Sequence, residues 1–424
     1  MRAYFFTEDA YPYLPPEDTY ESVRVNFPNK HCDPLKVAEL YDKYLDIWTA
    51  ADEIGLEIMN NEHHQTITCM VPSANLMLAI LAKRTKRARL LILGNPIANR
   101  NQPMRVAEEM AMLDCLSHGR LDCGFVRGVP YEISAANISA FRGSERLWEA
   151  HDLIKKAWTS HDGPVNFEGR FYHHRQINIW PRPYQQPHPP VWVTMGSGPS
   201  ADPVAKNKYT GAVFLAGYGG IRPIFDGYQA AYKKHHGTHA PLDRLAYCAL
   251  VYVSDSEKAA KEGAEELIWY ITANKVAEQW KNPPGYFPPQ VAGQMMKTAS
   301  KHAIQSIGAA GGIDQFGKTT PDEQVLKGNM MYGTPDQVYG QLKKFFDYTG
   351  GFGNLLIMGQ AGFLSYENTV KSMQLFNDHV YPRLKELTAK WDPEEAMAKR
   401  DQVQVPKSNR DYEDFSVDFV RKVS

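Results

Sequence analysis

Two adjacent histidines are the first candidates for chemistry in this sequence. His63 and His64 follow Glu62 in the segment MNNEHHQT, directly after a short apolar run. An imidazole gains or loses a proton near neutral pH, so a histidine at the end of a strand is a candidate general base or hydrogen-bond donor. A solvated polar loop is the alternative. Metal binding is disfavoured, because adjacent side chains diverge and the sequence contains no H-x-H pair.

Two arginines could contact a phosphate group. Arg127 and Gly128 end the apolar run FVRG, where the arginine offers a planar guanidinium and the glycine allows close backbone approach. Arg146 lies near the start of the next predicted helix. Taken alone, either arginine is more typical of a surface ion pair, so the prediction depends on what lies beside them in the fold.

A glycine-rich turn, GSGPSA at residues 196–201, is the strongest phosphate-binding motif. Its backbone N–H groups and two serine hydroxyls stand at a predicted helix start, which favours an anion. The string also matches the dinucleotide fingerprint G-x-G-x-x-A, which requires an acidic residue about 20 positions later, at the end of the next strand. That strand reads GAVFLAG, without an acid. The turn therefore predicts a phosphate and not a dinucleotide, and a plain strand–helix turn is the alternative.

The elements that must position these residues alternate between β-rich runs and helical periods. Helices are predicted over Ser73–Thr85, Pro103–Ser117 and Ser144–Thr159. Eight strands are predicted: Arg2–Phe6, Leu56–Asn60, Ala88–Gly94, Leu121–Val126, Val191–Met195, Gly211–Ala216, Leu245–Val253 and Asn354–Met358. Alternation implies a parallel sheet, and eight units imply an α/β fold of the closed (β/α)8 barrel type. Chemistry in such a barrel sits at the carboxyl ends of the strands.

Several segments exceed a minimal barrel over residues 1–390. Residues 7–34 form a long loop rich in Pro and Tyr, and residues 163–189 contain a predicted hairpin around Phe167–Phe171 and then a Pro-rich stretch. Residues 271–333 lack clean periodicity, which is typical of a lid or of disorder. Residues 391–424 are predicted to be a charged C-terminal extension that packs outside the barrel.

Composition limits the kinds of partner. Of 424 residues, 47 are Lys or Arg and 48 are Asp or Glu, so the net charge is −1 and no basic field exists to hold nucleic acid or an anionic bilayer. The 5 cysteines include no C-x-x-C pair, which argues against a disulfide framework or a structural zinc site. No apolar run approaches the ~18–20 residues of a membrane span, and the N-terminus lacks a signal-like apolar segment. We expect a soluble, cytoplasmic protein.

Five motifs together give the chain a family resemblance. They are, in order, EHH, PMRVAEEMAMLDCLSHGRLDCGFVRG, SERLWEAHDLIKKAW, HPPVWVTMGSGPS and YGTPDQV. Their order and spacing resemble those of the bacterial luciferase-like flavin monooxygenases over nearly all of residues 1–390. The resemblance implies a (β/α)8 barrel that holds reduced FMN at the carboxyl ends of its strands. It also implies that residues 271–333 form a mobile lid, which would keep water from the oxygen chemistry.

The resemblance also assigns roles to single residues. It places His63 beside the reactive edge of the flavin, where a neutral imidazole would take a proton or hydrogen-bond the peroxide, with His64 next to it. Because adjacent side chains diverge, we expect His64 to orient the loop. It places Gly94–Asn95 at the family's non-proline cis peptide under the ring. The positions of the phosphate ligands correspond to Arg127, Arg146, Ser197 and Ser200. The other flavin-contacting positions are Val126, Met195, Gly196 and Gly198. Because Val126 replaces a cysteine of the luciferase and Gly196 replaces a glutamate, light emission is not implied.

The function implied by the resemblance is that of a flavin-dependent monooxygenase. It would use reduced FMN (FMNH2) and O2, through a C4a-hydroperoxyflavin, to oxygenate a small organic substrate, with an aldehyde or ketone slightly favoured over an activated aromatic ring. A separate NAD(P)H:flavin reductase would supply the reduced cofactor, since the sequence shows no nicotinamide site. Deazaflavin (F420)-dependent hydride transfer and a non-catalytic flavin-binding subunit are the alternatives.

A homodimer is the assembly that the resemblance implies. In the family, the second and third helices pack across a two-fold axis, and the matching segments here are Ser73–Thr85 and Pro103–Ser117. Such an interface would bury more than ~2,000 Å². The apolar residues available on the two segments are Leu76, Met77, Ile80, Leu81, Met104, Met110, Met112 and Leu116.

Overall fold

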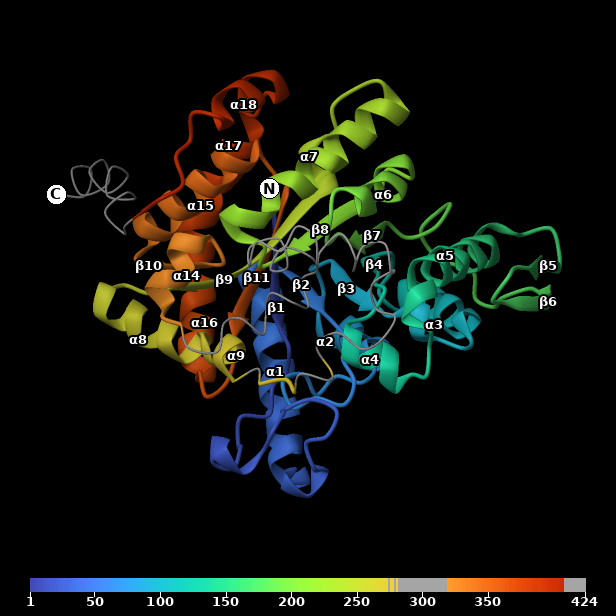
Figure 1. Ribbon diagram of the computed structural model, residues 1–424, viewed down its shortest axis with the longest axis horizontal. Coiled ribbons are helices and arrows are strands. Elements are labelled where there is room, and N and C mark those ends of the chain that lie inside the picture. The colour runs from blue at the N-terminus through green and yellow to red at the C-terminus, as the bar shows by residue number, and fades with distance from the viewer. Residues whose placement is uncertain (274, 278–279, 281–318, 408–424) are drawn as a thin grey trace, which may run out of the picture.

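Eight parallel strands close into a barrel in the computed structural model, which describes residues 1–273, 275–277, 280 and 319–407 (Figure 1). The strands, in ring order, are β1 (Arg2–Thr7), β2 (Glu57–Asn60), β3 (Leu90–Asn95), β4 (Leu121–Phe125), β7 (Val191–Thr194), β8 (Thr210–Phe214), β9 (Leu245–Val253) and β11 (Asn354–Gln360). β11 pairs with β1 and closes the ring. The predicted (β/α)8 barrel is confirmed.

Helices follow the strands and surround the barrel (Figure 1). They are α1 (Pro34–Ile54), α2 (Ala74–Arg84), α3 (Pro103–Leu116), α4 (Pro130–Ala135), α5 (Gly143–Thr159), α6 (Asp202–Lys206), α7 (Gly217–His236), α8 (Glu257–Leu267), α9 (Trp269–Thr272), α14 (Pro321–Lys327), α15 (Pro335–Thr349), α16 (Tyr366–Leu375), α17 (Tyr381–Ala389) and α18 (Pro393–Arg400). A π-helical turn, Phe376–Val380, joins α16 to α17. Among the described residues, no helix has the length and apolar character needed to cross a membrane.

Local signals in the sequence explain where the long helices begin and end. The carboxylate of Asp33 accepts a hydrogen bond from the N–H of Leu35 at 3.0 Å, and Pro34 occupies the first helical position of α1. Gly55 ends this helix with a φ of 106°, a left-handed conformation that glycine adopts without a steric penalty. These caps fix α1 between β1 and β2, so the loops at the carboxyl ends of both strands lie on the same side of the barrel.

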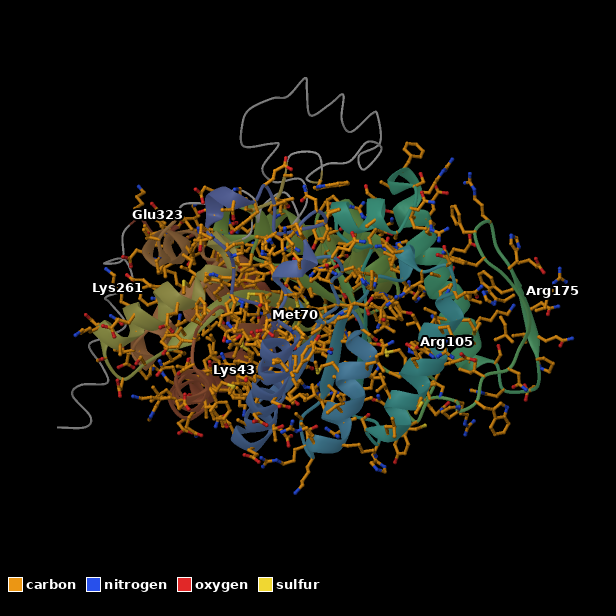
Figure 2. The ribbon with its side chains drawn as sticks, turned by 90° about the horizontal axis from the view of Figure 1, so that it is seen from below. Lys43, Met70, Arg105, Arg175, Lys261 and Glu323 are labelled. Carbon is orange, nitrogen blue, oxygen red and sulfur yellow. The ribbon has the colours of Figure 1, made fainter. Side chains whose placement is uncertain are left out.

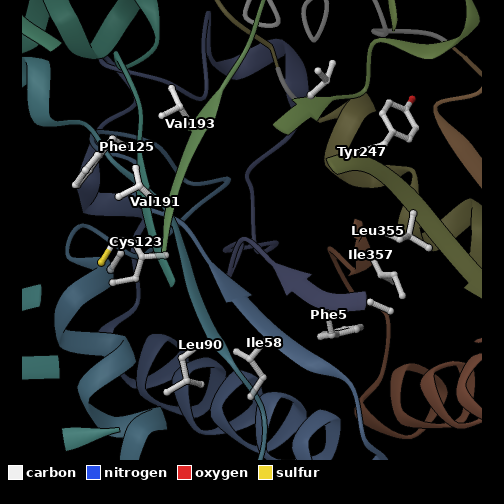
Figure 3. Packing of buried hydrophobic residues seen from close by; sticks show 14 of the residues in the cluster. Phe5, Ile58, Leu90, Cys123, Phe125, Val191, Val193, Tyr247, Leu355 and Ile357 are labelled. Carbon is white, nitrogen blue, oxygen red and sulfur yellow. The ribbon is translucent and has the colours of Figure 1, made fainter. Parts of the chain in front are cut away.

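Side chains alternate along the strands between two apolar cores. Phe5, Ile58 and Leu90 point outward and join the cluster that includes the helix residues Trp48 and Trp158 (Figure 3). The intervening residues fill the inside of the barrel, among them Tyr4, Phe6, Met59, Leu91, Leu93, Trp192, Cys248 and Met358. Because both faces of each strand are buried, the strands read as continuous apolar runs in the sequence.

The segment 271–333 contains two elements that the sequence analysis missed. α14 begins at a capping box, in which the Thr320 hydroxyl accepts from the N–H of Glu323 and the Glu323 carboxylate accepts from the N–H of Thr320. β10 (Met330–Gly333) then pairs in parallel with β9. Residues 321–333 therefore form regular elements although the sequence of this segment lacks clean periodicity. Residues 281–318, the main part of the predicted lid, lie outside the described residues.

The predicted hairpin is present and projects from one side of the barrel. β5 (Val165–Glu168) and β6 (His173–Ile177) pair antiparallel, and Figure 2 shows Arg175 of this hairpin far from the centre of the molecule. The Glu149 carboxylate of α5 accepts hydrogen bonds from the N–H groups of Arg170, Phe171 and Tyr172 at 2.7–3.0 Å. These bonds hold the hairpin turn against α5.

The described part of the C-terminal extension packs on the outer helices. The indole N–H of Trp391 donates to the carbonyl oxygen of Gly350 at 2.9 Å, at the end of α15. Arg400 of α18 forms an ion pair with Asp226 of α7, and Arg222 of α7 pairs with Asp401 at 2.8 Å. Residues 391–407 therefore pack against the helices on the outside of the barrel.

Candidate active site

His63 lies in the loop after β2, between two carboxylates. Its Nδ1 is 2.8 Å from Oε1 of Glu132 in α4, and its Nε2 is 3.7 Å from Oε1 of Glu8, which follows β1. The second distance is too long for a hydrogen bond, so Glu8 acts on the ring through its charge. Both carboxylates are buried, whereas 19% of the His63 side chain remains exposed.

The surroundings of His63 favour its charged form. Burial disfavours the imidazolium, but the charge and hydrogen bond of Glu132, with the charge of Glu8, raise the pKa of His63 above its ordinary value. In return, although burial opposes it, His63 lowers the pKa of Glu132, helped by the N–H of His64. The sequence analysis assumed a neutral imidazole; the structure shifts the balance towards an imidazolium–carboxylate pair.

His64 points into a separate ion cluster. Its Nε2 is 2.9 Å from Oε1 of Glu62, and the guanidinium of Arg100 binds the same oxygen. Oε2 of Glu62 accepts from the N–H of Ala74 at 3.3 Å, at the start of α2. The Glu62 side chain is fully buried. These contacts tie the histidine loop to α2, which supports an orienting role for His64.

Several buried polar atoms at the carboxyl ends of β1, β2 and β3 have no hydrogen-bond partner among the described residues. They are Oε2 of Glu8, Oδ1 of Asn60, Oδ1 of Asn95 and both amide atoms of Asn99. Asn60 and Asn95 are the last residues of β2 and β3, whereas Glu8 and Asn99 follow β1 and β3. A buried polar atom without a partner costs free energy, so this group requires water or a polar ligand. The unsatisfied atoms fit a ring with its own carbonyl and N–H groups, as a flavin has.

Close contact between β3 and β4 explains the glycine at residue 94. A Cβ atom on Gly94 would lie 2.7 Å from the carbonyl oxygen of Gly124 and 3.1 Å from Cγ1 of Val126. The N–H of Val126 donates to the carbonyl of Asn95 at 2.9 Å, so these predicted flavin neighbours are brought together. The non-proline cis peptide is Leu93–Gly94, one bond before the predicted Gly94–Asn95.

The two arginines predicted to bind phosphate lie at the first turn of α5, Arg146 within it and Arg127 beside it. Arg127 lies against the start of this helix, since a Cβ on Gly143 would be 3.2 Å from its Cδ. Arg146 donates from Nε to the carbonyl of Ala98 at 3.0 Å and from Nη2 to that of Arg100 at 3.2 Å. Arg146 therefore braces the loop after β3, a role that the sequence analysis did not foresee. Their contact with phosphate stays a prediction.

The turn after β7 is closed by its own serines. Oγ of Ser200 donates to the carbonyl of Ser197 at 2.7 Å and accepts from its N–H at 3.2 Å. Met195 is buried beneath the turn. A Cβ on Gly198 would lie 3.0 Å from the carbonyl of Pro223 in α7, whereas a Cβ on Gly196 would meet nothing within 4 Å. The turn therefore packs against α7 at Gly198 and has free space beside Gly196. Phosphate binding here also stays a prediction.

Sequence reasoning missed three charged residues of this site. Glu8 follows β1 as His63 follows β2, so the same strand-end argument could have found it. Glu132 lies on the six-residue α4, which was not predicted. Arg24, 3% exposed, contacts the hydroxyl of Tyr131 and lies over its ring at 4.7 Å. No group of three or more His, Cys, Asp or Glu residues able to hold a metal occurs within the described ranges.

Comparison with known proteins identifies relatives of two kinds. The luciferase-like monooxygenase family matches residues 24–351. The chain is 30% identical over 235 residues, or 54% of its length, to the oxygenase component of a flavin-dependent trigonelline monooxygenase from Acinetobacter baylyi. It is 27% identical over 335 residues to an F420-dependent glucose-6-phosphate dehydrogenase from Amycolatopsis mediterranei, covering 74% of this chain and 85% of that one. It spans 64% and 51% of the lengths of two curated relatives that it matches.

A solved structure supports the fold. The oxygenating constituent of 3,6-diketocamphane monooxygenase from Pseudomonas putida, described as a type II Baeyer-Villiger enzyme in complex with FMN, superposes with a TM-score of 0.64. The match covers 90% of this chain and 98% of that one at 19% identity. At this identity the likeness concerns the fold alone.

Proposed function

The chain belongs to the luciferase-like monooxygenase family, and from this premise we propose that it is a flavin-dependent monooxygenase. It would use reduced FMN and O2 to oxygenate a small organic substrate at the carboxyl ends of its barrel strands. The observation that carries the proposal is His63 at the carboxyl end of β2, where two buried carboxylates favour its charged form, together with unpartnered buried polar atoms at the carboxyl ends of β1, β2 and β3.

Bound FMN would supply the reducing equivalents that activate O2 at this site. Oδ1 of Asn60, Oδ1 of Asn95 and both amide atoms of Asn99 are unpartnered and would be available to the polar edge of a flavin ring. Gly94 at the end of β3, Val126 after β4, and Met195, Gly196 and Gly198 at the turn after β7 are the other residues proposed to contact the flavin. The positively charged and hydroxyl groups proposed to bind the phosphate are those of Arg127, Arg146, Ser197 and Ser200.

His63 would hold or transfer the proton that the reaction requires. Because its Nδ1 is engaged by Glu132, Nε2 is the atom that exchanges a proton with a reacting oxygen. Glu8 lies 3.7 Å from Nε2 and favours the protonated ring there. A general acid or base placed in this way typically contributes ~10²–10⁴-fold to the rate.

The substrate and the source of reduced FMN are also proposed from the relatives. Two of them are named as an oxygenase component and as an oxygenating constituent, which supports a separate NAD(P)H:flavin reductase as the partner here. The diketocamphane enzyme supports a ketone or aldehyde as substrate, and the trigonelline enzyme supports an aromatic ring. We keep the carbonyl substrate as the first candidate.

Deazaflavin-dependent hydride transfer is the second candidate, favoured by the F420-dependent relative. The two functions differ in their need for oxygen. Two assays test this. In the first, the protein receives reduced FMN and O2 consumption is followed. In the second, it receives oxidised F420 with secondary alcohols or sugar phosphates, and F420 reduction is followed. O2-dependent product with FMN supports the monooxygenase; F420 reduction under anaerobic conditions would replace it with the dehydrogenase.

A homodimer is proposed on the faces of α2 and α3. These adjacent helices expose large apolar side chains: Leu76 by 72%, Ile80 by 47% and Met112 by 54%. Met77, Leu81 and Met110 of the same helices are buried against the barrel. Exposed apolar patches of this kind are typical of a protein interface. Light scattering at micromolar concentration should give twice the 48.0 kDa chain mass, and a monomer mass would contradict the proposal.

A further inference from the structure

One carboxylate oxygen in the site serves two donors at once. Oε1 of Glu132 is 2.8 Å from Nδ1 of His63 and accepts the backbone N–H of His64 at 3.0 Å. Glu132 comes from α4, after β4, whereas both histidines belong to the loop after β2. The Glu132 carboxylate, which belongs to α4, therefore holds in place both the His63 ring and the backbone of the loop after β2.

We propose that Glu132 is a positioning residue that holds the His63 ring with Nε2 towards the reacting atoms and keeps that nitrogen protonated. The inference rests on the proposed function only for which reaction takes place. The protonation state of the His63 imidazole does not depend on that function. In the step concerned, the Nε2–H bond breaks, the proton passes to a basic oxygen atom in the site, and the neutral imidazole regains a proton from water. No electron is transferred to or from the protein in this step.

The charged groups that act on His63 come from α4 and from the long loop after β1. Glu132 approaches from α4 and Glu8 from the end of β1, and both favour the imidazolium. Arg24, from the loop after β1, opposes it. Burial also opposes it. The two carboxylates outweigh these effects, and only Glu132 is within hydrogen-bond distance of the ring. Removing the charge of Glu132 should therefore reverse the balance.

The experiment is an NMR titration of His63 in the purified protein without cofactor. Histidine labelled with ¹³C and ¹⁵N reports the midpoint of each imidazole, and the signal of His63 is the one lost in His63→Asn. In Glu132→Gln the side chain keeps its size and its acceptor oxygen but loses its charge. The midpoint of His63 should fall by about 1–3 pH units, the range expected for loss of a close opposite charge. In Glu132→Asp the charge is retained and most of the shift should return.

The neutral ring provides a second readout. In the wild type its proton should reside on Nδ1, facing Glu132, and the ¹⁵N shifts distinguish this tautomer from the Nε2–H form. A merely structural role for Glu132 would leave both readouts unchanged. The matched control is Glu168→Gln, which removes the exposed partner of His173 at 3.1 Å in the hairpin. This variant should leave the His63 titration unchanged.

Two outcomes would overturn the inference. One is a His63 midpoint in Glu132→Gln equal to that of the wild type, and the other is a wild-type ring that carries its neutral proton on Nε2. Either result would leave the monooxygenase proposal standing, because the titration uses no cofactor, substrate or oxygen. Conversely, an F420-dependent dehydrogenase with a shifted His63 midpoint would retain the inference and reject the proposed oxygen chemistry.

Discussion

The barrel carries a buried charged cluster at each end, and the two differ in how completely their atoms are paired. At the end of the barrel where the strands begin, the guanidinium of Arg89 donates two hydrogen bonds to the carboxylate of Asp122. Nε donates to Oδ2 at 2.9 Å and Nη2 donates to Oδ1 at 2.6 Å. The hydroxyl of Tyr4 donates to the same carboxylate at 3.1 Å. At the carboxyl end, Oε2 of Glu8 and both carboxylate oxygens of Asp9 have no partner among the described residues.

This difference separates a structural cluster from a binding one. A buried carboxylate satisfied by a bidentate arginine contributes to holding neighbouring strands together. A buried carboxyl without a partner disfavours its own charged form: burial and the charge of Glu8 raise the pKa of Asp9 well above its usual value. The carboxyl end therefore retains unsatisfied groups in the folded protein, which is the property expected of a site that gains a ligand.

Replacing His63 should give the largest functional effect. In His63→Asn, product formation should fall by ~10²–10⁴-fold because a positioned proton-transfer group is lost. Oxygen should still be consumed and released as peroxide. The measurement is the ratio of product to peroxide in a single turnover with reduced FMN. His64→Ala should be milder, since His64 contacts Glu62. Wild-type coupling in His63→Asn would remove His63 from the chemistry.

Replacing Asp122 should give the largest effect on stability. In Asp122→Ala, the free energy of unfolding should fall by ~3–5 kcal/mol, because the guanidinium of Arg89 loses its buried partner. The control is Asp46→Ala, which breaks the exposed pair with Arg84 and should cost less than ~1 kcal/mol. Urea unfolding measures both. Equal losses in the two variants would show that the N-terminal cluster does not stabilise the barrel.

Loss of Arg127 should weaken cofactor binding about tenfold or more, since a charge-assisted contact contributes ~1.5–3 kcal/mol. The effect should appear with reduced FMN and be absent with riboflavin, which lacks the phosphate. Anaerobic titrations compare Arg127→Ala with a control variant, Arg175→Ala. Arg175 is an exposed arginine of the hairpin, so its loss should leave binding unchanged. If wild-type protein binds riboflavin as tightly as FMN, the phosphate site is wrong.

The smallest expected effect is the pH dependence of the His63–Glu132 contribution to stability. The pKa of His63 is raised above 6.5 in the folded protein, so its contribution is complete below pH 6.5 and is lost as pH rises through the raised value. The pKa of Glu132 is lowered below 4.5, so its contribution is complete above pH 4.5 and is lost as pH falls.

The difference in unfolding free energy between wild type and Glu132→Gln should therefore be greatest between pH 4.5 and 6.5. Each unit of pKa difference corresponds to ~1.4 kcal/mol. Denaturant unfolding at several pH values measures it. A difference that is constant from pH 4 to pH 9 would contradict the coupling of the two groups.

The sequence contained the information for the barrel and for His63, but not for what surrounds His63. Strands buried on both faces give continuous apolar runs, and a histidine after such a run must lie at the carboxyl end of the barrel. Glu132 could not be predicted, because its short helix lacks periodicity and its contact joins segments 69 residues apart. β10 was missed for a similar reason: four residues give no period, and its pairing with β9 is set by the tertiary fold.

Arg146 shows a different limit of sequence reasoning. A motif can identify an arginine near a phosphate site, but it cannot show that Nε and Nη2 already bind the carbonyls of Ala98 and Arg100. The bracing of the loop after β3 depends on how α5 packs, which no local pattern contains. The same holds for the unpartnered atoms at the carboxyl ends of β1, β2 and β3, whose burial depends on how neighbouring elements pack.

The most direct test of the proposed chemistry is the fate of labelled oxygen. The protein, with a flavin reductase, NAD(P)H and FMN, is incubated under ¹⁸O2 with a panel of cyclic ketones, aldehydes and N-methylpyridinium carboxylates, and the products are analysed by mass spectrometry. We predict that one ¹⁸O atom enters the product and that His63→Asn abolishes most of this incorporation. Product formed without ¹⁸O, or formed equally well without oxygen in the presence of F420, would contradict the assignment as a monooxygenase.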